Sequence, residues 1–179
     1  MVGVKGRKVA GFPPSPSHLK VDGTQLNFGL PAYRTTEDVL DDLPDVNAPE
    51  AELIPNHEPT MHTEPMLRLF AGLQPGQRCR ASFHDRLHPG RLGYTLRAGS
   101  GNFSPLRPIH YKHDRVISVR ESARLQGFAD TFIWPDSIPR LQQYRQVGNA
   151  VCPPIASALG KMICRILGWA GNPEGFLGD

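Results

Sequence analysis

Cysteine and histidine are the residue types that could carry covalent or metal chemistry here, but their spacing favours neither. The three cysteines are odd in number and widely spaced, at Cys79, Cys152 and Cys164. A disulfide framework needs an even set and a zinc site needs close pairs such as CxxC, so this spacing indicates free thiols. A metal site usually has a histidine at close, regular spacing from a cysteine or a carboxylate. No such spacing is found around these histidines: His57, His62, His84, His88, His110 and His113. The sequence therefore predicts no metal site.

Arginine gives a stronger chemical signal, because the basic residues are unevenly distributed along the chain. The formal net charge is only +3, which an ordinary protein surface can also have. Acidic residues concentrate between Glu37 and Glu64, whereas basic residues with few acids among them occupy the middle of the chain: Arg78, Arg80, Arg86, Arg91, Arg97, Arg107, Lys112, Arg115, Arg120 and Arg124. Guanidinium groups match phosphate in charge and geometry. This asymmetry predicts a polyanionic partner.

Two segments have a pattern specific enough to indicate a family. Arg115–Phe128 reads RVISVRESARLQGF and Tyr144–Pro154 reads YRQVGNAVCPP. In composition, order and separation they resemble the ninth and tenth motifs of the DNA cytosine-5 methyltransferases. Thr95–Gly99 is similar to the Thr-Leu element near the end of that family's target-recognition region, and Arg107–His110 is similar to the stretch that leads into the ninth motif.

The resemblance extends more loosely toward the start of the chain. Asn56–Gly76 resembles the connector before the recognition region, and Lys5–Gly11 resembles a remnant of the eighth motif that lacks the usual glutamine. The resemblance implies an α/β fold, a partial Rossmann-like methyltransferase domain with a small irregular target-recognition domain. Its implied parts are a catalytic-domain remnant and connector in 1–55, a recognition region in 56–114, and the last two motifs in 115–179.

The family resemblance also implies a reaction and a set of contacts. These enzymes transfer a methyl group from S-adenosyl-L-methionine to cytosine C5 in duplex DNA after flipping the base out, with a cysteine attacking C6. By resemblance, the Asn149 side chain would hydrogen-bond the methionine end of S-adenosyl-L-methionine, and the backbone of Val151 would line the same pocket. Thr95, Arg97 and Arg7 would contact DNA.

Each of these residues also has a plainer interpretation. Arg120 and Glu121 are expected to be structural organisers that brace the recognition region, but with Arg124 they could form an ordinary salt-bridged helix surface. Asn149 could be a turn residue after a glycine. Thr95 and Arg97 could belong to a polar loop.

No stretch resembles the family's Pro-Cys nucleophile loop, its Glu-Asn-Val segment or its glycine-rich cofactor loop. Cys152 is a neighbour of the cofactor turn and not a nucleophile, so we expect no catalytic residue in this chain and only a partial cofactor site. Activity would then require a complementing N-terminal methyltransferase chain, in a restriction–modification system. Two alternatives remain open: a non-catalytic DNA-binding or regulatory remnant, and a decayed gene fragment.

The elements that must position these residues are mainly helices. Thr35 or Thr36 is a plausible N-cap for a short helix over 37–43 that Pro44 stops. An apolar pattern predicts a second helix over 65–73, and 77–111 has the composition of loops and short strands. A short strand is also possible over 8–12.

The last third of the chain has clearer helix signals. Ser118 and Glu121 form a capping box, and Gly127 ends that helix in the left-handed conformation. A helix is expected over 137–147, with Pro139 in its first turn and Gly148 at its end. Pro153 and Pro154 open a final helix that ends at Gly168, and its apolar stripe is expected to be core: Ile155, Leu159, Met162, Ile163, Ile166 and Leu167.

The chain has no run of the roughly 20 apolar residues that a membrane helix needs, and Met1–Arg7 leads into no apolar signal-peptide core. From the sequence we therefore expect a cytoplasmic or otherwise intracellular protein with no membrane partner.

Overall fold

A computed structural model gives the fold of the chain and describes residues 17–18, 31–97 and 107–168. The chain divides into two compact units. We call Arg34–Ala150 the central unit, and Met1–Tyr33 together with Val151–Asp179 the terminal unit. Arg7 and the expected strand over 8–12 lie outside the described residues.

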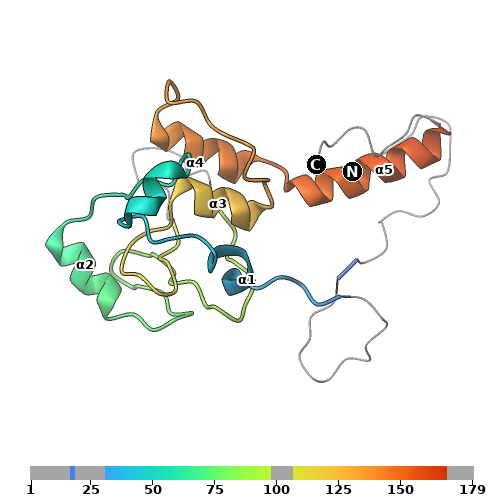
Figure 1. The fold of residues 1–179 in the computed structure, drawn as a ribbon. Helices are drawn as coiled ribbons and strands as arrows, with labels where there is room; N and C mark the ends of the chain where they lie inside the picture. Colours follow the sequence, from blue (N-terminus) through green and yellow to red (C-terminus); the bar gives the residue numbers. More distant parts are fainter. Residues whose placement is uncertain (1–16, 19–30, 98–106, 169–179) are drawn as a thin grey trace, which may run out of the picture. The chain divides into compact units, whose positions relative to one another are not determined.

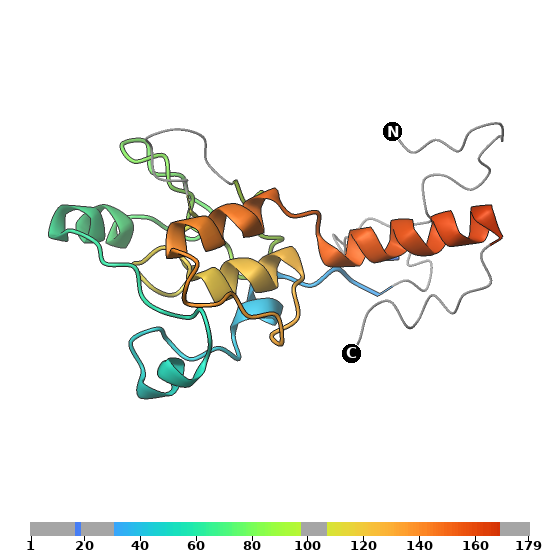
Figure 2. The ribbon, with the colours of Figure 1, turned by 90° about the horizontal axis from the view of Figure 1, so that it is seen from above.

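The central unit consists of short helices joined by long connections (Figure 1). Its helices are α1 (Thr36–Leu40), the 3-10 helix η1 (Pro49–Leu53), α2 (Glu64–Ala71), α3 (Val119–Gln126) and α4 (Arg140–Asn149). Helix α3 packs against both α1 and α4, and α3 and α4 lie side by side in both views (Figures 1 and 2). Helix α3 is therefore the element around which the unit is organised.

Two of the expected helix starts in the central unit are confirmed by their capping residues. The Thr35 side chain accepts from the Asp38 backbone and the Asp38 carboxylate accepts from the Thr35 backbone, which is a capping box. Ser118 and Glu121 form the same reciprocal arrangement at the start of α3, and Gly127 ends that helix with φ of 86°. A bulky residue is strained at that backbone angle, so glycine suits this position.

Helix α4 differs from the sequence prediction at both ends. It begins at Arg140, three residues later than expected, because the Ile138 N–H bonds the Pro135 carbonyl in a separate turn. Pro139 is the N-cap with ψ of 136°, so it lies before the first turn of the helix. Gly148 lies within the helix, which continues to Asn149.

The α/β expectation is met only in part, because the described residues contain no extended strand. Their strand-like pairing consists of isolated bridges, Arg78 with Asp85, Arg86 with Ile109, and Ile109 with Val116. The described parts of the stretch 77–111, residues 77–97 and 107–111, are irregular, as predicted, but the expected short strands are single bridges there. A Rossmann-like sheet is not present among the described residues.

Apolar side chains form three small clusters in the central unit rather than one large core. The first joins Val119 and Ala123 of α3 to Trp134, Tyr144 and Val147. The second consists of Leu40, Leu87, Tyr111 and Ile117, and the third of Phe70, Ile109 and Val116. The segment 109–119 contributes to all three clusters, so it ties the unit together.

The terminal unit contains α5 (Pro153–Leu167), which ends at Gly168 with φ of 68°, as the sequence predicts. The expectation that its apolar stripe is core is wrong at the two ends of the stripe. Met162 is buried and Leu159, Ile163 and Ile166 are partly buried, whereas Ile155 is 55% exposed and Leu167 is 48% exposed. A helical stripe becomes core only when another apolar surface covers it, and the described residues of this unit provide little beyond α5 itself.

Of the described helices, none is individually long and apolar enough to cross a membrane, and only α4 and α5 taken together as a broken pair would qualify by length and composition.

Candidate functional site

Arg120 lies in the interior of the central unit, with 0% of its surface exposed. Its Nε donates to the Pro55 carbonyl at 3.1 Å and its Nη2 donates to the Phe132 carbonyl at 3.0 Å. Its backbone N–H donates to the Asn56 carbonyl at 2.8 Å. Burial lowers the pKa of Arg120 from its usual value, since desolvation disfavours the charged form. The guanidinium thus holds two separate loops against α3.

Glu121 is the buried carboxylate next to it and is paired with Arg115. Arg115 donates to both carboxylate oxygens, at 2.8 Å and 2.9 Å, and the Ser118 backbone N–H donates at 2.6 Å. Burial acts to raise the pKa of Glu121, but the hydrogen bonds and charge of Arg115 outweigh it and hold the pKa below its usual value. The pair is bidentate and shielded from water, so removing either partner would leave a buried charge without compensation.

The interpretation as an exposed salt-bridged helix surface is therefore wrong for Arg120 and Glu121. Arg124, in contrast, forms ion pairs with the exposed carboxylates of Asp42 and Asp130. Arg124 is the most accessible of the three, yet its Nη1 donates to the Val39 carbonyl at 3.2 Å and to Asp42 at 2.5 Å. These contacts link the end of α1 to α3. The helix turns its charged residues toward neighbouring segments because those segments present carbonyls and carboxylates.

Asn56 and His57 are buried polar residues whose individual roles the sequence did not indicate. Asn56 Nδ2 donates to the Trp134 carbonyl at 3.0 Å, and the Trp134 N–H donates back to Oδ1 at 2.9 Å. His57 Nε2 donates to the Pro44 carbonyl at 2.9 Å, and its Nδ1 lies 2.8 Å from the Ser118 hydroxyl. Asn56 has φ of 63°, a conformation that asparagine tolerates better than most residues. Their partners lie far away in sequence, so no local pattern reveals these contacts.

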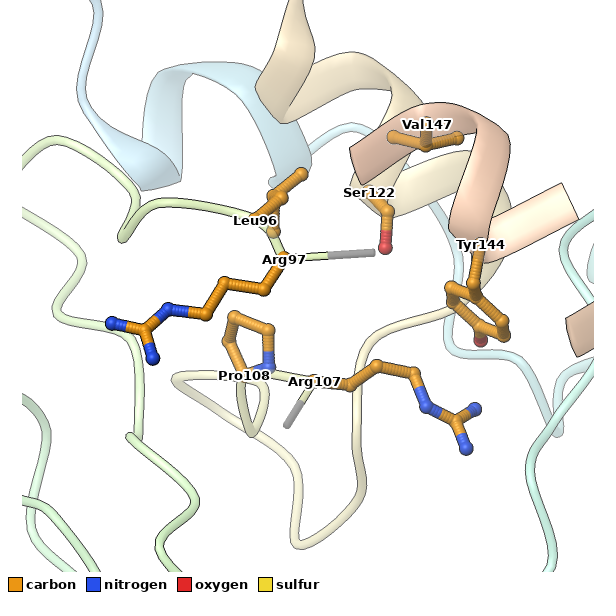
Figure 3. A pocket seen from close by; sticks show the side chains of 7 residues that line it. All are labelled: Leu96, Arg97, Arg107, Pro108, Ser122, Tyr144 and Val147. Atoms are coloured by element: carbon orange, nitrogen blue, oxygen red, sulfur yellow. The ribbon is translucent and has the colours of Figure 1, made fainter. Parts of the chain in front are cut away.

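A small pocket with room for about one water molecule lies beside α3 and α4 (Figure 3). The residues that line it are Leu96, Arg97, Arg107, Pro108, Ser122, Tyr144 and Val147. The guanidinium of Arg107 lies 4.4 Å from the centre of the Tyr144 ring, and its Nη1 donates to the Thr60 hydroxyl at 3.1 Å. The Tyr144 hydroxyl donates to the Ile117 carbonyl at 2.8 Å, and burial raises the pKa of Tyr144.

The structure brings some of the expected DNA-contacting residues to this pocket. Arg97 lines the pocket, and its guanidinium points away from that of Arg107 (Figure 3). Thr95 is exposed nearby in sequence but is not one of the lining residues. Arg7 lies outside the described residues. Arg107 was not singled out as a contact residue, although its place beside the ninth-motif resemblance was a signal.

The two residues expected at the cofactor are both accessible. Asn149 is the last residue of α4 and is exposed, so it lies in the helix and not in a turn. Val151 is 64% exposed and is the first residue of the second segment of the terminal unit. Between them, the Ala150 carbonyl accepts from Gln126 Nε2 at 2.9 Å.

No group of three or more histidine, cysteine or acidic side chains within the described ranges is placed to hold a metal ion. The three cysteines are unpaired, with Cys79 buried and the other two, Cys152 and Cys164, partly exposed.

Comparison with known proteins gives consistent matches. Residues 54–165 match the family described as C-5 cytosine-specific DNA methylase. A type II methyltransferase of Haemophilus parahaemolyticus, M1.HphI, is 32% identical over 156 residues, which is 81% of this chain and 41% of the relative. A second one, M.XorII of Xanthomonas oryzae, is 38% identical over 112 residues, which is 60% of this chain and 26% of the relative.

A solved crystal structure resembles this fold as well. It is a putative DNA modification methyltransferase encoded within a prophage of E. coli, with a TM-score of 0.55 and 34% identity. The similarity covers 66% of this chain and 32% of that structure. The chain thus spans less than half the length of these bacterial relatives and of that structure.

The fold is therefore similar to that of a DNA methyltransferase. Within that class, the chain belongs to the C-5 cytosine-specific DNA methylase family. Members of this family use S-adenosyl-L-methionine as the methyl donor.

Proposed function

We propose that this chain is the C-terminal portion of a DNA (cytosine-5-)-methyltransferase, which transfers a methyl group to cytosine C5 in duplex DNA once a catalytic half completes it. The observation that carries the proposal is the family match over residues 54–165, which includes the buried Arg115–Glu121 pair and the pocket beside α4. The two bacterial relatives are named type II methyltransferases, which supports a role in restriction–modification.

Arg120 and Glu121 act in this proposal as structural organisers, with Arg115–Phe128 as the ninth motif. Arg120 joins α3 to the carbonyls of Pro55 and Phe132, and Glu121 joins the start of α3 to Arg115. Together they fix the position of α3, whose Ser122 lines the pocket that also contains Arg97. Neither residue touches substrate.

DNA contact is assigned to the recognition region, residues 56–114. Arg97 and Thr95 are exposed at its edge, and the guanidinium of Arg97 is directed away from the protein's own Arg107 (Figure 3). A phosphate group could therefore pair with Arg97 without displacing an internal partner. Base flipping requires a firm grip on the phosphates beside the target cytosine, and arginine provides it.

Asn149 and Val151 form part of the cofactor site in this proposal. The Asn149 amide would hydrogen-bond the methionine end of S-adenosyl-L-methionine, and the Val151 backbone would lie beside it. When bound, that cofactor supplies the methyl group. The remaining contacts, and the cysteine nucleophile, belong to the catalytic half, so none of the three cysteines here is assigned a catalytic role.

The exposed face of α5 supports the need for a catalytic half, on the same or on a second polypeptide. Ile155 is 55% exposed, and an apolar helix face normally packs against another element. Relatives contain much more chain than this segment matches, which is consistent with a covering surface there. The α5 stripe is then an interface rather than a free surface.

A methyl-transfer assay tests the proposal directly. Labelled S-adenosyl-L-methionine and mixed-sequence duplex DNA are combined with this chain alone, and with the chain plus an N-terminal half from a related enzyme. Incorporation in the mixture alone supports the proposal, and Ile155→Asp should abolish it while the exposed Lys161→Ala on the same helix should not. Absence of incorporation in both reactions contradicts the proposal.

The second candidate is a non-catalytic DNA-binding or regulatory role, favoured by the arginine-rich stretch from Arg78 to Arg124. Salt-sensitive duplex binding that is unchanged by a catalytic half, with no methyl incorporation, would identify it.

A further inference from the structure

The segment from Arg78 to Asp85 is a tight turn that closes on itself. Arg78 and Asp85 pair in an antiparallel bridge, and the Cys79 N–H donates to the His84 carbonyl at 2.7 Å. The Phe83 N–H donates to the Cys79 carbonyl at 2.8 Å. We call this segment the 78–85 turn; its internal hydrogen bonds fix the backbone at its tip.

The base of the 78–85 turn is anchored in the central unit. Cys79 is buried, and the His84 ring meets the fully buried Phe70 ring edge-on at a centroid distance of 5.2 Å. The Asp85 carbonyl accepts from the Ile109 N–H at 2.8 Å. Contacts at Cys79, His84 and Asp85 thus anchor both ends of the turn to the central unit, and they fix the position of the residue at its tip.

That side chain is Phe83, which combines two unfavourable features. Its φ is 58°, the left-handed conformation that a bulky side chain rarely adopts, and its surface is 56% exposed. The ring is too exposed for its packing in the fold to compensate for the free-energy cost of the strained backbone. Strain of this kind persists where the surrounding structure enforces it, and it gathers at functional positions.

One arginine lies against the exposed ring and a second is on the same turn. The Arg78 guanidinium lies 5.8 Å from the centre of the Phe83 ring, and Arg80 is exposed on the same turn. Arg78 also lies 3.8 Å from Asp85, a separation too long for a strong ion pair, so it remains available to another anion. An exposed aromatic ring on a turn that also carries two exposed arginines suits a nucleic acid, because the ring stacks on a base face while the cations contact phosphates.

We propose that Phe83 stacks on a nucleobase of bound duplex DNA at a partly unstacked base step, with Arg78 and Arg80 contacting the adjacent phosphates. This inference rests on the proposed function, since it takes duplex DNA as the partner and names a residue that positions it. Phe83 is a positioning residue, and its ring contributes where the DNA is easiest to distort.

Duplex binding by the full chain tests the inference. The probe is mixed-sequence duplex DNA with 2-aminopurine placed at successive positions, because its fluorescence rises when the base leaves its stack. Phe83→Ala should weaken binding about ten-fold and remove the fluorescence rise at one position, whereas Phe83→Trp should retain both. Arg80→Ala should lower the slope of log affinity against log salt by about 0.9. Leu53→Ala, at an apolar residue that is 84% exposed elsewhere, is the control and should change nothing.

Phe83→Gly separates a binding role from a structural one. Glycine relieves the strain at φ of 58°, so the melting temperature should rise by about 2–4 °C while DNA binding falls as in the alanine variant. Affinity and fluorescence equal to wild type in Phe83→Ala would overturn the inference but leave the proposed function intact. No duplex binding by the wild-type chain would overturn both. Loss of stability in Phe83→Gly would indicate a packing residue and also overturn the inference.

Discussion

Replacing Glu121 tests whether the buried network holds the central unit together. The side chain of Glu121 is 2% exposed and that of Arg115 is 8% exposed, so water screens the pair very little. Removing one partner of a buried ion pair costs about 3–5 kcal/mol. Arg115 keeps a second contact, from its Nε to Asp45 at 3.3 Å, so we expect the lower end of that range.

Two substitutions separate the charge of Glu121 from its capping role. Glu121→Gln keeps an oxygen for the Ser118 N–H, and we expect the free energy of unfolding to fall by about 3 kcal/mol. Glu121→Ala also removes the cap and should cost about 1 kcal/mol more. In the double variant Arg115→Met/Glu121→Met the total should be smaller than the sum of the single effects by about 1 kcal/mol or more.

Urea unfolding of the full chain, followed by the fluorescence of the buried Trp134, measures these differences. Substitutions at exposed surface positions usually change the free energy of unfolding by less than about 0.5 kcal/mol, so changes this small in both Glu121 variants would place Glu121 among such positions. Such values would refute the argument that the Arg115–Glu121 pair stabilises the unit. Additive costs in the double variant would refute the coupling between the two residues.

Three other predictions follow from the same contacts. Asn56→Ala leaves the buried Trp134 N–H and carbonyl without partners and should lower the free energy of unfolding by about 2 kcal/mol or more. Asn56→Gly tolerates the φ of 63° but loses the same hydrogen bonds, so it should also destabilise the protein. An unchanged urea midpoint would contradict this prediction. Burial lowers the pKa of His110 to about 4, so the unfolded chain binds the proton first as the pH falls. The free energy of unfolding should therefore drop by about 3 kcal/mol between about pH 6.5 and pH 4. His110→Gln should lose this pH dependence, and an identical plot of stability against pH in the variant would count against it. Arg97→Ala should weaken duplex binding and lower its salt slope by about 0.9, whereas the exposed Arg68→Ala on α2 should not; equal slopes would remove Arg97 from the DNA contact.

Helix starts were predictable because each depends on residues only three positions apart. Thr35 with Asp38 and Ser118 with Glu121 form capping boxes in the structure, and Gly127 and Gly168 end their helices in the left-handed conformation. The start of α4 was predicted too early, since a separate turn at Pro135–Ile138 competes with the helix for the same backbone groups. Local competition of this kind leaves little trace in an apolar pattern.

The placement of α3 in the interior was not predictable from its own residues. The string RESAR resembles an exposed charged helix, yet Arg120 and Glu121 are buried. Their partners, Pro55, Phe132 and Arg115, come from other segments, and the Pro55 contact spans 65 residues of sequence. The same holds for Asn56 with Trp134, which spans 78 residues.

The sequence by itself determined the family, through two motifs whose residue types and spacing are specific. It also determined the capped starts of α1 and α3 and the glycine ends of α3 and α5, because capping and chain reversal depend on neighbouring residues. Only the tertiary structure decided that Arg120 and Glu121 are internal, that Arg97 borders a pocket with Tyr144, and that the two ends of the α5 stripe remain exposed. It also revealed the left-handed backbone at Phe83. Burial and strain at these positions depend on which distant segments supply hydrogen bonds or apolar cover, and that information is not contained in local sequence.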